Sequence, residues 1–151
     1  MIAFDLDGVL QPDLRYTKNF NLVEVNSVRN LMIPLYQPKG KWCIITSRSM
    51  EDADEIARWI DKSFEVKPAL VVQSCREGEI SSVYKARMLD RYTNITAYIE
   101  SDHETALDIK ANMVRRDCAI LSLTNLLDRA LSGIHDSHNY IRGVSYEKIS
   151  C

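Results

Sequence analysis

Short, continuously apolar runs alternate with longer amphipathic segments along most of this 151-residue chain. Runs that are apolar at successive positions are typical of strands covered on both faces, as in a parallel sheet. We predict five such strands, at Met1–Phe4, Trp42–Thr46, Ala69–Gln73, Ile95–Ile99 and Cys118–Leu123.

The segments between these strands carry apolar residues at helical spacing. We expect helices at about residues 25–35, where Pro34 should kink or end the segment, after the capping pattern Ser49–Asp52, over Ile80–Tyr92, and from Asp102 onward. Alternating strands and helices predict an α/β sandwich with a mainly parallel sheet. Without a repeat or linker in the sequence, we predict a single domain over residues 1–151, in which residues 132–151 have the weakest pattern.

Charge, cysteine content and hydropathy limit the classes of protein to which this chain can belong. A net charge of −2 argues against bulk attraction to nucleic acid but allows a local cationic pocket. The four cysteines are widely spaced without a C-x-x-C, so we expect reduced thiols and a cytoplasmic protein. No apolar stretch reaches the roughly 18 residues of a membrane span, and no signal peptide precedes the first predicted strand. The oligomeric state is not indicated by any pattern.

Polar clusters follow three of the predicted strands, at Asp5–Gly8, Thr46–Arg48 and Glu100–Asp102. Because ligands bind at the carboxyl ends of parallel strands, we expect these clusters to converge. In an extended chain, Asp5 and Asp7 face the same side, and two close carboxylates need a cation or proton between them. Mg²⁺ suits such oxygen ligands. The alternative is structural: Asp5 caps the strand, and Asp7 and Gly8 form a turn.

The segment Phe4–Leu10, FDLDGVL, resembles the first motif of the haloacid dehalogenase (HAD) superfamily of phosphohydrolases, an apolar strand followed by D-x-D-G-[TV]-L. Thr46 matches the second motif, a Ser or Thr that closes a strand. Lys85 matches the third, a lysine ahead of the strand that carries the last acidic motif. Glu100–Asp102 stands where the fourth motif, an acidic pair, is expected. The resemblance spans about residues 1–123 and implies a Rossmann-like, three-layer α/β/α sandwich.

The resemblance also implies a role for each matched residue. Asp5 would be the nucleophile and a ligand of Mg²⁺. Asp7 would be the general acid and base, and its backbone carbonyl would also bind the metal. Thr46 would donate a hydrogen bond to the phosphoryl group, and Lys85 would neutralise its charge and hold Asp5. Taken alone, Thr46 could be an ordinary strand end and Lys85 a solvated helix residue.

The fourth motif departs from the family pattern, because Ser101 separates the two acids where the family commonly has adjacent aspartates. We expect Asp102 to be the metal ligand, with Glu100 as the second choice. Structural roles compete: Ser101 and Glu104 fit a capping box, and Asp102 fits an N-cap.

The spacing of the motifs bears on the substrate. About 34 residues separate Asp7 from Trp42 and about 38 separate Thr46 from Lys85, which leaves no room for a large cap domain and predicts an open site. Thr46-Ser47-Arg48 resembles the S/T-G-R of the phosphatase domain in polynucleotide kinase-phosphatases, as do Gln73–Glu77 and Val83–Lys85.

That likeness implies that Arg48 clamps a phosphate, with Ser47 beside it in the substrate site. Arg76 is a second candidate, and Arg15 and Lys18 are expected near the site. The chain lacks G-x-x-x-x-G-K-[ST], so no kinase half is present in this sequence.

These features together predict a Mg²⁺-dependent, capless phosphatase that acts on phosphomonoesters, with nucleic-acid 3′-phosphate ends as the candidate substrate. One alternative is a phosphatase of small molecules such as nucleotides or sugar phosphates. Another is a catalytically weak binding module with the same fold, which the altered fourth motif favours.

Overall fold

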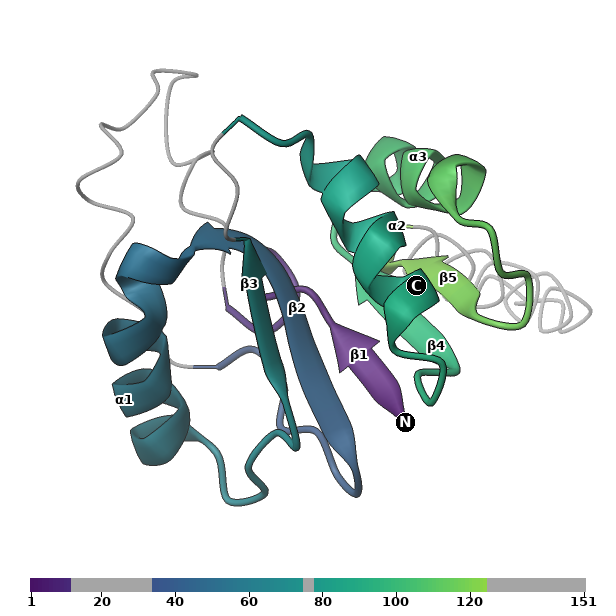
Figure 1. Ribbon diagram of the computed structural model, residues 1–151. Coiled ribbons are helices and arrows are strands. Elements are labelled where there is room, and N and C mark those ends of the chain that lie inside the picture. Colours follow the sequence, from purple (N-terminus) through teal and green to yellow (C-terminus); the bar gives the residue numbers. More distant parts are fainter. Residues whose placement is uncertain (12–33, 75–77, 125–151) are drawn as a thin grey trace, which may run out of the picture.

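The computed structural model describes residues 1–11, 34–74 and 78–124 (Figure 1). Within these ranges, five parallel strands form one sheet in the order β3-β2-β1-β4-β5. The strands are β1 (Ile2–Phe4), β2 (Trp42–Ser49), β3 (Val71–Ser74), β4 (Ala97–Glu100) and β5 (Ala119–Ser122). The helices are the short 3₁₀ turn η3 (Met50–Asp52), α1 (Ala53–Ser63), α2 (Ser81–Arg91) and α3 (His103–Asn112).

The five predicted strands are confirmed, with shifted ends. β2 continues three residues past Thr46, and β4 begins two residues after Ile95, whose N–H donates to the Tyr92 carbonyl in a turn. Ser49 accepts the N–H of Glu51 and so caps η3, which leads directly into α1.

The helix expected at residues 25–35 lies almost entirely outside the described residues. Its last residue, Leu35, is not helical, and its N–H donates to the Leu10 carbonyl. The tail at residues 132–151 also lies outside the described part.

The central position of β1 follows from the order of the strands. Phe4 pairs with Ile44 of β2 on one side and with Ile99 of β4 on the other. The chain moves outward from β1 through β2 to β3, then returns to the other side of β1 for β4 and β5. Such a reversal creates a crevice at the carboxyl ends of the two strands that flank it, here β1 and β4.

Helices cover both faces of the sheet. Alternate residues of β1 and β2 enter two separate buried clusters, with Ala3 and Cys43 in one and Phe4 and Ile44 in the other. Helix α1 contributes Ile56, Trp59 and Ile60 to the second cluster, and α2 and α3 contribute Tyr84, Met88, Leu89 and Ile109 to the first. Crossovers between parallel strands are right-handed. The crossover from β2 to β3 runs across the sheet in one direction, and those from β3 to β4 and from β4 to β5 run in the other. The helix α1 therefore lies on the opposite face from α2 and α3, as Figure 1 shows.

Cys43 and Cys118 are free and buried, and burial raises the pKa of the Cys43 thiol to about 11. Among the described helices, none has the length and apolar character needed to cross a membrane.

The packing of α2 predicts the effect of a cavity in the core. Leu89 is 0% exposed, so Leu89→Ala should lower the free energy of unfolding by about 2–5 kcal/mol. Leu107 on α3 is 48% exposed and provides the matched control, for which we expect a loss below about 1 kcal/mol. Urea unfolding of both variants tests this. Equal losses of unfolding free energy would contradict the burial of Leu89 in the core.

Candidate active site

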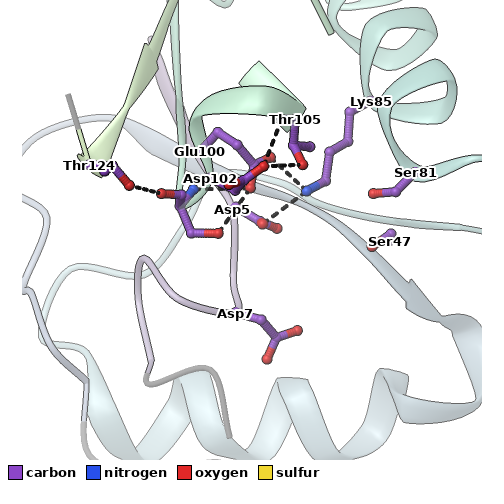
Figure 2. A pocket seen from close by; sticks show the side chains of 10 residues that line it. Asp5, Asp7, Ser47, Ser81, Lys85, Glu100, Asp102, Thr105 and Thr124 are labelled. Atoms are coloured by element: carbon purple, nitrogen blue, oxygen red, sulfur yellow. Dashed lines mark hydrogen bonds and ion pairs between the residues drawn. The ribbon is translucent and has the colours of Figure 1, made fainter. Parts of the chain in front are cut away.

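A cavity of about 550 Å³ lies at the carboxyl ends of the strands (Figure 2). Its lining is polar and comes from segments far apart in the sequence: Asp5, Asp7, Ser47, Ser81, Lys85, Glu100, Ser101, Asp102, Thr105 and Thr124. The predicted convergence of the strand ends is therefore observed.

At the base of the cavity, one ammonium group bridges two carboxylates (Figure 2). The Lys85 Nζ lies 2.9 Å from Asp5 Oδ2 and 2.8 Å from Glu100 Oε2. Asp5 follows β1, Glu100 ends the adjacent β4, and Lys85 comes from α2, so three elements meet in this contact. All three residues are buried, with at most 6% exposed. The alternative of a solvated Lys85 is therefore excluded.

The second oxygen of each carboxylate also accepts hydrogen bonds. Asp5 Oδ1 accepts the N–H of Leu6 at 2.9 Å. Glu100 Oε1 accepts the N–H and the hydroxyl of Ser101 at 3.0 and 3.2 Å, and the Tyr98 hydroxyl lies 3.2 Å from Oε2. These bonds fix the orientation of both carboxylates.

Burial and charge act in opposite directions on this group. Burial, together with the charge of Glu100, raises the pKa of Asp5 to about 8, although Lys85 opposes the rise. For Glu100, burial acts upward, but the charge of Lys85 and its hydrogen bonds lower the pKa on balance. Burial acts downward on Lys85, and the two carboxylates nevertheless raise its pKa. When both acids are ionised, two negative charges face one cation in this group.

Asp7 lies apart from this group in Figure 2 and forms a different ion pair. Arg48 donates from Nε to Oδ2 at 2.9 Å and from Nη2 to Oδ1 at 2.7 Å, a bidentate contact. Burial opposes the charged form of Arg48, but the bonds and charge of Asp7 raise its pKa. The guanidinium predicted to clamp a phosphate thus holds the predicted general acid in this structure.

The remaining predicted residues divide into three groups. Ser47 lines the cavity. Thr46 is 1% exposed, its hydroxyl accepts the Arg48 N–H at 3.2 Å, and it is not among the described residues of the lining. Arg76, Arg15 and Lys18 lie outside the described residues.

Asp102 caps a helix, the structural role that was the alternative to metal binding. It is the N-cap of α3, and its Oδ2 accepts the N–H and the hydroxyl of Thr105, both at 2.8 Å. These two bonds lower the pKa of Asp102. The cap is Asp102 and not Ser101, whose hydroxyl instead donates to Glu100. Asp102 also lines the cavity.

Three residues of the lining were not predicted. Ser81 precedes Lys85 by four residues on α2, so helical spacing could have placed both on one face. Thr105 follows Asp102 by three residues and takes part in its cap. Thr124 comes after β5, and its hydroxyl donates to the Ser101 carbonyl at 3.1 Å, a contact without a signal in the sequence.

The described residues contain no group of three or more His, Cys, Asp or Glu side chains arranged to hold a metal ion.

Counted as ionised, Asp5, Asp7, Glu100 and Asp102 carry four negative charges, and Lys85 and Arg48 carry two positive ones. The difference is two negative charges in and beside the cavity.

Comparison with protein-family models, with curated proteins and with solved structures finds no match to this chain. Its function is therefore inferred from the residues and the geometry of the site.

The raised pKa of Asp5 predicts a dependence of stability on pH. In the unfolded chain this carboxyl ionises near 3.8, whereas in the folded protein it keeps its proton to about 8. Between these two pH values the folded state thus binds more protons than the unfolded state. The free energy of unfolding of wild type, relative to that of Asp5→Asn, should therefore fall as the pH rises through this window. Without divalent cations, we expect a relative change of more than about 1 kcal/mol between about pH 5 and about pH 8.

Urea unfolding at several pH values measures this difference. Asp61→Asn is the control, because the Asp61 side chain is 83% exposed and should give no such trend. Parallel stability curves for wild type and Asp5→Asn would contradict the electrostatic description of the site.

Proposed function

We propose that this protein is a metal-dependent phosphatase that hydrolyses phosphomonoesters through an aspartyl-phosphate on Asp5. The observation that carries the proposal is the buried Asp5–Lys85 contact of 2.9 Å at the end of the central strand, on the wall of a polar cavity. A carboxylate nucleophile with a fixed cation beside it suits phosphoryl transfer, which depends mainly on positioning and charge neutralisation.

Two steps follow from this assignment. In the first, a carboxylate oxygen of Asp5 forms a bond to phosphorus while the bond to the ester oxygen breaks, and Asp7 gives its proton to the leaving oxygen. In the second, Asp7 removes a proton from water, the water oxygen attacks phosphorus, and Asp5 leaves as a free carboxylate. Lys85, beside Asp5, offsets negative charge on the phosphoryl oxygens, and Thr46 and Arg48 are the proposed phosphate contacts.

The fold that we propose is a three-layer α/β/α sandwich of the HAD type without a large cap. Support comes from the helices on both faces and from the nucleophile's place after β1, beside the crevice between β1 and β4.

The charge of the site fits a divalent cation. Mg²⁺ is commonly held by one or two carboxylates together with waters, so a cluster of three acids is not required. Glu100 already accepts hydrogen bonds on both oxygens. Asp5 also accepts on both oxygens, so this argument bears only on the choice between Glu100 and Asp102 for the second carboxylate. We assign the metal to Asp5, the backbone carbonyl of Asp7 and Asp102, with Glu100 as the second choice. When bound, Mg²⁺ would supply positive charge for the phosphoryl oxygens.

Of the two substrate classes, the lining favours a small hydrophilic phosphomonoester over a nucleic-acid end. Lys85 is the one basic residue among the described lining residues, and that set contains no aromatic ring on which a base could stack. Recognition through the phosphate and through hydroxyl groups, such as those of Ser47 and Ser81, is what these side chains offer.

Loss of the nucleophile tests the reaction. We expect Mg²⁺-dependent release of phosphate from 4-nitrophenyl phosphate, and a fall in kcat/KM on the order of 10³-fold or more in Asp5→Asn. Asp61→Asn, an exposed acid on α1, should retain wild-type activity. Mass spectrometry of the acid-quenched enzyme should find one phosphoryl group on the peptide that contains Asp5. Absence of release with several divalent ions would instead support a binding module.

Turnover of matched substrates tests the substrate class. We expect kcat/KM for a 3′-phosphorylated oligonucleotide to be no higher than that for a 3′-mononucleotide, because the described lining offers no stacking surface. A stacked base contributes about 1–3 kcal/mol, so a preference for the oligonucleotide of about tenfold or more would contradict this and favour 3′-ends.

A further inference from the structure

Gln11 lies beside Asp7 because the chain folds back after β1. The N–H of Gly8 donates to the Gln11 carbonyl at 2.7 Å, the N–H of Gln11 donates to the Leu6 carbonyl at 3.0 Å, and Asp7 and Gln11 form an isolated bridge. Gly8 has a φ of 79°, which favours glycine and allows the tight reversal. The backbone thus sets the Gln11 side chain next to Asp7.

The Gln11 amide contacts the Asp7 carboxylate directly. Its Nε2 donates to Asp7 Oδ1 at 2.5 Å, the same oxygen that accepts from Arg48 Nη2. Gln11 is 2% exposed and is not among the described residues that line the cavity, whereas Asp7 is among them. Gln11 is therefore a buried residue that contacts Asp7 from outside the described lining of the cavity.

We infer that Gln11 is a positioning residue that orients Asp7 for proton transfer, an inference that rests on the proposed function. A general acid has to reach the leaving oxygen at about 2.6–3.2 Å, and a misplacement of about 1 Å can cost about 10²-fold in rate. Asp7 follows β1 on a loop, so its orientation depends on the groups that contact it.

Arg48 alone is a poor anchor for this purpose. It is also the proposed phosphate contact, and the charge of a phosphoryl group attracts it away from Asp7. The amide of Gln11 is neutral, so a phosphate competes for it much less, and it adds no negative charge to a site that already has an excess. Gln11 keeps Asp7 in place while Arg48 serves the substrate.

The test is the dependence of kcat/KM on the leaving group in Gln11→Met, which removes the donor and keeps the length of the side chain. Across 2,4-dinitrophenyl, 4-nitrophenyl and phenyl phosphate, the need for a proton on the leaving oxygen increases. We expect a loss below about 3-fold for the dinitrophenyl ester and about 10- to 100-fold for the phenyl ester. In the Asp7→Asn background, Gln11→Met should change kcat/KM for the phenyl ester by less than about 2-fold.

The matched control is Gln73→Met. Gln73 is 8% exposed, and its Nε2 donates to the Ser49 carbonyl at 2.7 Å. Any loss in this variant should be equal for the three esters. The inference is overturned if Gln11→Met loses activity equally on all three, or still loses activity without Asp7.

If Gln11→Met is unfolded by circular dichroism, the same series in Gln11→Leu decides. Unfolding of both variants would assign Gln11 to the folding of the loop and would overturn the inference. The proposed function fails separately, when wild type releases no phosphate or when Asp5→Asn retains activity.

Discussion

The Lys85 ammonium, shared between Asp5 and Glu100, is the contact on which the site depends. Buried charges are costly unless they are paired, and removal of one partner leaves the other unpaired. Here two carboxylates from neighbouring strands depend on one cation that reaches them from α2. The arrangement fixes the position of α2 against β1 and β4. Burial, with the charge of Glu100, still raises the pKa of Asp5 to about 8, although Lys85 opposes the rise.

Periodicity and the positions of polar clusters were enough to predict much of the fold and the cavity. Continuous apolar runs identified all five described strands, because a strand covered on both faces needs apolar side chains at every position. Asp5 and Glu100 could be predicted to meet because parallel strands bring their carboxyl ends to one edge. Lys85 lies on α2, and its place beside Asp5 was implied only by the resemblance to the HAD motifs. The spacing of residues on a helix could also have identified Ser81.

The partners of the side chains could not be predicted in the same way. A guanidinium binds a carboxylate as readily as a phosphate, so the sequence pattern of Arg48 did not reveal its contact with Asp7. Gln11 has the polarity of a loop residue, and its burial depends on a fold-back of the backbone that a pattern does not show. Asp102 fits both a cap and a ligand, because a carboxylate oxygen can accept a backbone N–H at a helix start or bind a cation.

The two cations explain why the proposed reaction would need a metal. In this structure Lys85 and Arg48 are each already paired with a carboxylate, and the site has two negative charges in excess when its four acids are counted as ionised. A bound phosphomonoester adds about −1.5 to −2 more. Drawing Arg48 to the phosphate leaves Asp7 without its ion pair and does not change the total charge. A divalent cation adds two positive charges to the site. On the proposed function, its binding therefore favours the ionised form of Asp5 and the binding of the phosphomonoester.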